Sequence, residues 1–338
     1  MKVTTTAPKK AAAPKKNFKS INDRCECPAQ IKKAGLFVGK MNTKKTVIII
    51  AGPTAVGKTA VAIAVAKALG TEIISADSRQ CYQELNIGVA RPAAAELAEV
   101  PHHFIATHSI HEKVTAAVFE KYALQKADAL FKKVDVVVMT GGTGLYLKAF
   151  CEGFDSIPDV PDAVHQQVIT DYNQQGLAWL QEEVQQADPF FYARGEIQNP
   201  QRLMRALEVY RATGTSIEAF KRGEKAKRDF NIIKTALYLP KEDLHRNINM
   251  RVDEMLKNGL VDEVESLVSC RHLNALQTVG YKEIFNYLDR QTGVAEAVEL
   301  IKKNTRLYAK RQMTWFRKDG DYKWLFPNAG SVLAFLKS

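Results

Sequence analysis

The residues best suited to chemistry lie in the segment GPTAVGKT, residues 52–59. Gly52, Gly57, Lys58 and Thr59 fit the G-x-x-x-x-G-K-[ST] pattern of a phosphate-binding loop. Glycines let successive backbone N–H groups face one phosphate oxygen, and a helix that starts after the loop directs its positive dipole end at the same anion. Lys58 adds a point charge, and the Thr59 hydroxyl can hold Mg²⁺. The segment predicts a site for a di- or triphosphate without indicating which one.

Two further groups could act on a molecule held by this loop. Asp77 follows an apolar segment, where a carboxylate can ligate Mg²⁺ or accept a proton from a nucleophile. Thr143 lies in the glycine-rich turn of residues 141–144, where its hydroxyl can donate to a substrate or a phosphate. Both also have a simpler interpretation, in which Asp77 caps the next turn through Ser78 and Thr143 only shapes its own turn.

The last long helix predicted, over residues 294–317, combines basic and aromatic side chains. Its basic residues recur at helical spacing with two aromatic neighbours: Lys303, Arg306, Lys310, Arg311, Arg317, Lys318, Trp315 and Phe316. Such a combination suits phosphate neutralisation and base stacking in RNA binding. A solvated basic face is the alternative interpretation.

The elements that must position these groups alternate between strands and helices. Strands are predicted at residues 47–50, 72–77, 135–140 and 232–239, and helices follow the phosphate loop and the glycine-rich turn. The alternation indicates a P-loop NTPase-like α/β fold, a parallel sheet with helices on both faces. Ligands of such sheets bind beyond the carboxyl ends of the strands. The phosphate loop, Asp77 and Thr143 all fall on that edge, so we expect them to form one site.

The composition changes in the middle of the chain. Residues 155–198 are rich in Gln and Glu at helical spacing and lack strand signals, which predicts a helical insertion domain. The next helix is bracketed by Asn199-Pro200 and by Gly214. We therefore expect a core of residues 45–154 and 199–320, interrupted by the insertion.

The net charge of +11 is concentrated at the N-terminus. Residues 1–40 hold ten Lys or Arg and two Asp or Glu, a net of +8, whereas the remaining residues contribute only +3. Residues 1–44 also lack the apolar content to pack, so they are predicted to form a basic, disordered tail. Such a tail is either a basic arm for RNA or a solvated extension.

Metal and membrane signals are weak. The five cysteines show no paired spacing, and the histidines at 102, 103, 108 and 111 have no supporting carboxylate pattern, so no zinc site is expected. No apolar run approaches the roughly 20 residues that span a bilayer. An odd cysteine count without a secretory signal fits a reducing compartment, and we expect a cytoplasmic protein.

The chain resembles the tRNA dimethylallyltransferase family in seven segments that occur in the family's order: GPTAVGKT, SADSRQCYQELNIGVARP, GGTGLYL, NPQRLMRALEVYRATG, MLKNGLVDEV, TVGYKEIFNYL and AKRQMTWFR. The resemblance covers about residues 45–318. It implies transfer of a dimethylallyl group from dimethylallyl diphosphate to N6 of an adenosine beside the anticodon of tRNA, with release of pyrophosphate and Mg²⁺ as the cofactor. The insertion would then clasp the anticodon stem-loop.

The resemblance also implies individual roles. Asp77 would take the N6 proton with Thr143 completing the contact, and Lys58 would stabilise the departing pyrophosphate. The implied diphosphate-binding residues are Gly52, Pro53, Thr54, Ala55, Val56, Gly57, Lys58, Thr59 and Arg251, and the implied metal ligands are Thr59 and Asp77. The implied tRNA-binding residues are Asp77, Ser78, Arg79, Gln80, Thr143, Gln201, Arg202, Leu203, Met204, Arg205, Thr278, Gly280, Tyr281, Lys282, Arg306, Lys310, Arg311, Gln312 and Arg317.

Two positions depart from the family pattern, since Asn247 and His165 stand where many members have arginine. The carboxyl-terminal zinc finger of nuclear-encoded relatives is absent, which points to a bacterial-type enzyme, and we expect a monomer. Three alternatives share the phosphate loop: an isopentenyltransferase acting on free adenine nucleotides, a small-molecule kinase, and a nucleotide-gated RNA-binding protein. The helical insertion and the tryptophan-bearing last helix favour tRNA as the acceptor.

Overall fold

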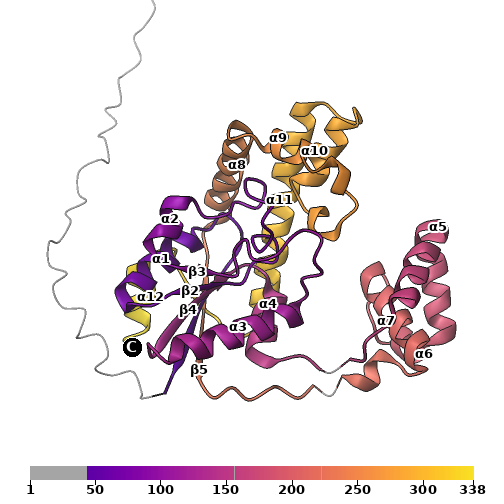
Figure 1. The fold of residues 1–338 in the computed structure, drawn as a ribbon, viewed down its shortest axis with the longest axis horizontal. Helices are drawn as coiled ribbons and strands as arrows, with labels where there is room; N and C mark the ends of the chain where they lie inside the picture. The colour runs from indigo at the N-terminus through magenta and orange to yellow at the C-terminus, as the bar shows by residue number, and fades with distance from the viewer. Residues whose placement is uncertain (1–43, 156, 222) are drawn as a thin grey trace, which may run out of the picture.

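The fold is built on one parallel sheet, seen edge-on between helices in Figure 1. The computed structural model describes residues 44–338 except 156 and 222, so the predicted tail lies almost wholly outside the described residues. The strand order is β3-β2-β4-β1-β5-β6, and every pairing is parallel. The strands are β1 (Thr46–Ala51), β2 (Ile73–Ser75), β3 (His102–His103), β4 (Val136–Gly141), β5 (Asn231–Leu237) and β6 (Lys323–Leu325).

Helices cover both faces of the sheet. Successive residues of the central strand β1 point to opposite faces, so alternate side chains pack against different helices. Ile48 and Ile50 of β1 pack with α1 (Lys58–Leu69), α8 (Lys241–Lys257) and α12 (Ala329–Phe335). Ile49 packs on the other side, in one apolar cluster with buried residues of α3 (Ala116–Phe131) and α4 (Gly144–Glu152). The predicted α/β class is therefore confirmed. The short edge strands β3 and β6 are additions, since two or three residues carry too little pattern to be predicted.

The C-terminal part forms a helical layer beside the sheet. It contains α9 (Leu260–Glu265), two 3₁₀ turns, η2 (Val268–Cys270) and η3 (Asn274–Leu276), α10 (Tyr281–Leu288) and α11 (Val294–Arg317), the last with the predicted bounds. The core does not end at residue 320 as expected, because β6 pairs with β5 and Val332 of α12 is buried against α1. No helix in the described part of the chain is both long and apolar enough to cross a membrane.

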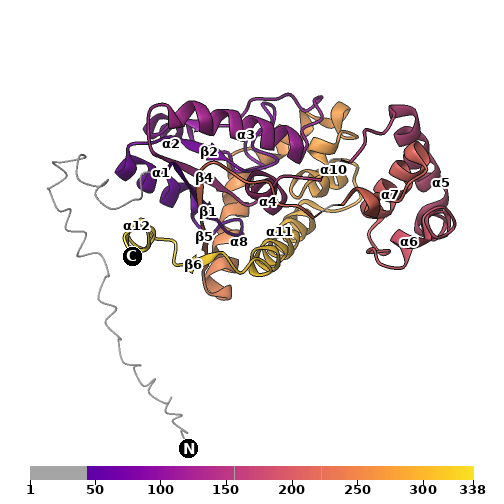
Figure 2. The same cartoon turned by 90° about the horizontal axis from the view of Figure 1, so that it is seen from below.

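The helical insertion lies at one end of the molecule, apart from the sheet (Figures 1 and 2). It comprises α5 (Asp162–Ala187), α6 (Pro189–Tyr192), α7 (Pro200–Thr213) and the turn η1 (Ile217–Phe220). Leu203 and Leu207 of α7 share a buried cluster with Val168 and Leu180 of α5. The sequence places the end of the insertion at residue 198, whereas this packing assigns α7 to it. We therefore propose that the insertion runs from Ile157 to Phe220.

Candidate active site

The phosphate loop connects the end of β1 to the first residue of α1. Gly52 has φ 146°, and a Cβ there would lie 2.8 Å from the Leu237 carbonyl oxygen, so only glycine fits. Lys58 begins α1, and its Nζ donates to the Pro53 carbonyl at 2.8 Å, across the loop. Burial lowers the pKa of Lys58 to about 8, with Asp77 opposing and Arg251 reinforcing the shift. The loop therefore holds an amine that titrates near neutral pH.

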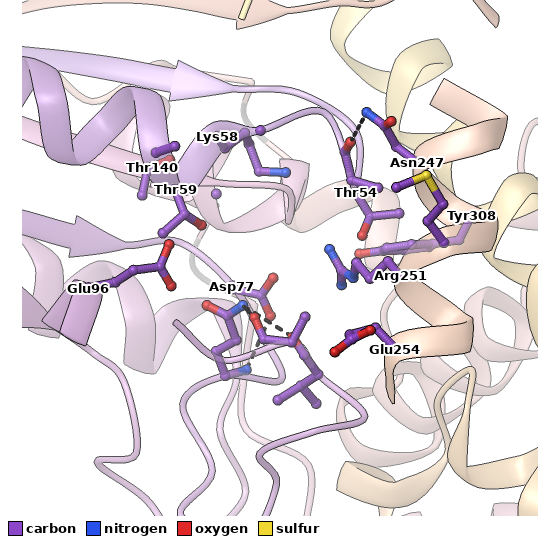
Figure 3. Close-up of a pocket in the computed structure, with 18 of the residues that line it drawn as sticks. Thr54, Lys58, Thr59, Asp77, Glu96, Thr140, Asn247, Arg251, Glu254 and Tyr308 are labelled. Atoms are coloured by element: carbon purple, nitrogen blue, oxygen red, sulfur yellow. Dashed lines mark hydrogen bonds between the residues drawn. The ribbon is translucent and has the colours of Figure 1, made fainter. Parts of the chain in front are cut away.

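Asp77 lies just beyond the end of β2, on the same edge of the sheet. Its Oδ1 accepts hydrogen bonds from the backbone N–H groups of Arg79 at 2.9 Å and Gln80 at 3.2 Å. Asp77 therefore caps the following turn, but it does so through the N–H groups of Arg79 and Gln80 rather than through Ser78. Among the described residues Oδ2 makes no hydrogen bond, and Figure 3 shows the carboxylate in the cavity across from Lys58. One carboxylate oxygen therefore positions Asp77 and the other faces the site.

The glycine-rich turn after β4 packs directly on the Asp77 segment. A Cβ at Gly141 would lie 2.1 Å from the Ala76 carbonyl oxygen, so the backbones approach as only glycine allows. Thr143 Oγ1 accepts from the Ser78 N–H at 3.0 Å and donates to Ser78 Oγ at 3.2 Å. The loop, Asp77 and Thr143 thus lie at the same edge of the sheet, where Thr143 contacts Ser78 and does not itself line the cavity described next.

A cavity of about 720 Å³ opens between these loops and the helices α8 and α11. Arg251 of α8 and Tyr308 of α11 project into it opposite the phosphate loop (Figure 3). Burial lowers the pKa of Arg251, although the nearby Asp77 carboxylate opposes the shift. A smaller cavity of about 130 Å³ adjoins it and shares Thr54, Ala55, Asp77, Val89, Arg251 and Tyr308. Five apolar side chains contribute to its remaining lining, together with Arg79 and two threonines: Ile248, Val252, Met255, Val279 and Ile301.

Four residues implied to bind tRNA have buried side chains in this structure. Gln312 is buried, its Oε1 accepting from the Thr54 N–H at 2.8 Å and its Nε2 donating to the Gly142 carbonyl at 2.9 Å. It therefore holds the phosphate loop and the glycine-rich turn together. Tyr281 is fully buried and donates its hydroxyl hydrogen to Glu263, and the side chains of Leu203 and Met204 lie in the core of the insertion. Of these four residues, Gln312 lines the active cavity and the other three do not.

Most of the other residues implied to bind RNA lie either on the core or on the insertion. Arg79, Thr278, Lys282 and Arg311 line a groove of about 360 Å³ beside the active cavity, with Tyr308 shared between the two. Lys310 and Arg317 are exposed on α11, Gly280 lines the small cavity, and Arg306 is half-buried with a 2.7 Å bond to Asn249. Gln201, Arg202 and Arg205 lie on α7 in the insertion and do not line the active cavity.

Several residues that line the active cavity were not predicted as site residues from the sequence. Asn247, one of the two departures from the family pattern, donates to the Ala55 carbonyl at 3.3 Å, so it contacts the phosphate loop directly. The other departure, His165, pairs with the buried Glu208 at 2.7 Å inside the insertion. Glu96, Glu254 and Tyr308 also line the cavity. No local pattern distinguishes them from ordinary surface positions, because only tertiary packing brings their helices to the site.

The fold and site define a P-loop-like α/β protein in which the phosphate-loop motif faces a carboxylate across one cavity. The IPP transferase family model matches residues 80–319. The chain is 45% identical to the tRNA dimethylallyltransferase of Christiangramia forsetii over 86% of this chain and 97% of the relative, and 44% identical to that of Cytophaga hutchinsonii over 84% and 93%. The chain therefore belongs to the IPP transferase family.

Solved structures agree with this assignment. The tRNA isopentenylpyrophosphate transferase of Bacillus halodurans superposes with a TM-score of 0.64 at 32% identity, covering 87% of this chain and 96% of that one. A eukaryotic dimethylallyltransferase described as acting on tRNA shares the fold with a TM-score of 0.69 at 24% identity, over 85% and 75% of the two chains. Both matches cover most of this chain and agree with its α/β fold.

Proposed function

We propose that this protein transfers the dimethylallyl group of dimethylallyl diphosphate to N6 of the adenosine adjacent to the anticodon in tRNA, releasing pyrophosphate. The proposal is carried by one observation: a single cavity has a phosphate-loop motif and a carboxylate oxygen on opposing walls, with a small, partly apolar annex beside Arg251. A prenyl diphosphate needs a cradle for its charge and a dry space for its five carbons.

The donor side would be bound by the phosphate loop and Arg251. Backbone N–H groups of the loop and the N-terminus of α1 would hold the diphosphate, and Lys58 would exchange its bond to Pro53 for a phosphate oxygen. As the allylic C–O bond breaks, negative charge builds on the leaving pyrophosphate, where Lys58 and Arg251 stabilise it. The annex of about 130 Å³ beside Arg251 would take the hydrocarbon chain.

The acceptor side would be formed by Asp77 and Thr143. The adenine N6 attacks the allylic carbon, a C–N bond forms, and the N6 proton passes to Asp77 Oδ2. Because Oδ1 is held by two backbone N–H groups, the carboxylate is fixed in direction before the substrate arrives. Thr143, joined to Ser78, would complete the contact with the adenine. Arg79, Lys282 and Arg311 would hold the RNA backbone in the groove beside the cavity, and the exposed Lys310 and Arg317 would extend this contact along α11.

The oxygen-rich donor set at the phosphate loop fits Mg²⁺, which prefers hard ligands and retains phosphate and water oxygens. Thr59, Ser75, Asp77 and Thr140 line the cavity there, and no group of three His, Cys, Asp or Glu residues in the described ranges could hold a metal unaided. Thr59 would hold the ion beside the diphosphate. When bound, the ion would neutralise charge on the diphosphate. The implied role of Asp77 as a metal ligand competes with its role as proton acceptor, because Oδ1 already accepts from two backbone N–H groups and Oδ2 is the oxygen that faces the site.

The experiment incubates the purified protein with Mg²⁺, labelled dimethylallyl diphosphate and one of three acceptors: an anticodon stem-loop with the target adenosine, AMP, or none. We expect label on the RNA alone. Label on AMP would favour the free-nucleotide prenyltransferase, and phosphate transfer from ATP without any prenylation would favour the kinase. The matched control is a stem-loop in which guanosine, which lacks the N6 amine, replaces the target adenosine.

A further inference from the structure

The turn at residues 86–88 is held by a single carboxylate from the C-terminal helical layer. Three consecutive backbone N–H groups, of Asn86, Ile87 and Gly88, donate to Glu263 of α9 at 3.2, 2.7 and 3.0 Å. The Tyr281 hydroxyl donates to the same carboxylate at 2.5 Å. A half-buried carboxylate with four donors is a strong, directional anchor, because hydrogen bonds to charged groups are stronger than those between neutral groups.

The packing around this carboxylate leaves the turn little freedom. Gly88 lies flat on the Tyr281 ring, and a Cβ there would come within 2.5 Å of Tyr281 Cε2. Burial, together with the adjacent Glu263, raises the pKa of Tyr281, so its hydroxyl stays a donor. Arg91 closes the other side of the turn, since its Nη2 donates to the carbonyls of Tyr82 at 2.6 Å, Gln83 at 2.9 Å and Leu85.

The residues that follow this turn line the active cavity. Val89 and Ala90 follow it and line the cavity wall. Their carbonyls accept from Gln80 Nε2 at 3.2 and 2.9 Å, and the Gln80 N–H is one of the two donors that fix Asp77 Oδ1. An unbroken series of contacts therefore leads from Glu263 through residues 86–90 and Gln80 to the carboxylate of Asp77.

We propose that Glu263 is a positioning residue for the reaction: it holds residues 86–90 so that Gln80 and Asp77 present the free carboxylate oxygen to the acceptor. The inference rests on the proposed function, since Asp77 is there the proton acceptor. Glu263 itself does not line either cavity and touches no substrate. Its loss would loosen one wall and misdirect Asp77 while leaving the phosphate loop intact.

The test compares Glu263→Gln with Glu265→Gln, an exposed glutamate on the same helix. A glutamine has one acceptor oxygen, and its NH₂ group opposes the backbone N–H donors of the turn. We expect kcat of Glu263→Gln to fall by about 10- to 100-fold, because misplacing a reacting group by about 1 Å costs this much. The KM for dimethylallyl diphosphate and the Kd for the RNA should stay within about twofold of wild type. Glu265→Gln should behave as wild type.

Hydrogen exchange of the peptide covering residues 84–91 gives a second readout that does not depend on activity. In Glu263→Gln the amides of residues 86–88 should exchange faster while those of β1 and β4 keep their protection. Unchanged exchange with unchanged kcat would overturn the proposal, as would a global rise in exchange with lost RNA binding, which indicates a merely structural role. If the wild-type protein transferred no prenyl group, the proposed function would fail, and the exchange result would still decide whether Glu263 holds the turn.

Discussion

The lowered pKa of Lys58 leads to a quantitative prediction about the donor. Burial desolvates its ammonium inside the phosphate loop, where it donates to the Pro53 carbonyl, and this lowers its pKa to about 8 from the ordinary 10.5 although Asp77 opposes the shift. Binding of a diphosphate requires the charged form. As pH rises through 8 the free protein loses that proton, so affinity for the donor should fall above pH 8 and be nearly constant below it.

The magnitude follows from the fraction of Lys58 that remains protonated. About nine-tenths is charged at pH 7, half at pH 8 and about a tenth at pH 9, so the Kd for dimethylallyl diphosphate should rise about tenfold between pH 7 and pH 9. Binding above pH 8 must also take up close to one proton, because the bound diphosphate raises the pKa of Lys58 again. The variant Lys58→Arg keeps its charge throughout this range.

Isothermal titration calorimetry without RNA measures both quantities. Titrations of the donor with Mg²⁺ at pH 7 to 9.5 give the Kd, and repeats in buffers of different ionisation enthalpy give the proton uptake. Lys58→Arg corrects for titration of the ligand itself, and Lys67→Met, a change at an exposed lysine on the same helix, controls for net charge. A wild-type Kd that stays flat to pH 9.5, or one that rises equally in Lys58→Arg, would refute the reasoning.

Three further predictions concern other parts of the site. Asp77→Asn keeps the acceptor oxygen for Arg79 and Gln80 but cannot take a proton, so kcat should fall by about 10²- to 10⁴-fold with RNA affinity retained, as single-turnover kinetics and filter binding would show. Gln312→Ala leaves a part-buried N–H and a buried carbonyl unpaired, which should lower the free energy of unfolding in urea by about 2–4 kcal/mol and raise the KM for the donor. Lys310→Ala removes one proposed phosphate contact, so the slope of log Kobs for the RNA against log salt should become shallower by about 0.7–0.9 while the donor KM is unchanged. Full turnover by Asp77→Asn, wild-type stability of Gln312→Ala, or an unchanged salt slope would contradict the respective assignment.

Local sequence patterns were sufficient to predict which segments lie at the carboxyl edge of the sheet. The phosphate loop, Asp77 and the glycine-rich turn each follow an apolar strand, and parallel strands end at one edge, so their convergence follows from topology alone. The bounds of α7 and α11 were also predicted correctly, because Asn199-Pro200, Gly214 and a long amphipathic pattern are local signals.

Contacts between elements far apart in the sequence could not be predicted from local patterns. The sequence predicts α7 as a helix but does not indicate that Leu203 and Leu207 face α5 rather than the sheet. Gln312 lies in a basic motif, and its position in the motif does not reveal that the side chain turns inward to two backbone groups. Tyr281 looks like a surface tyrosine at the start of a helix until Gly88 and Glu263 are seen to enclose it. Each error concerns which way a side chain points, which periodicity leaves open.

The helix α11 brings these separate findings into one physical arrangement. Its inward face carries Gln312, which ties the phosphate loop to the glycine-rich turn. Trp315 lies at the border of this face: the residue is 40% exposed, yet a Cβ at Gly144 would be 2.2 Å from the indole. Lys310 and Arg317 are exposed on the opposite side of the helix. In the proposed reaction, RNA bound by Lys310 and Arg317 and a diphosphate bound in the loop would contact the same helix, and the inward-facing Gln312 would link the two sites.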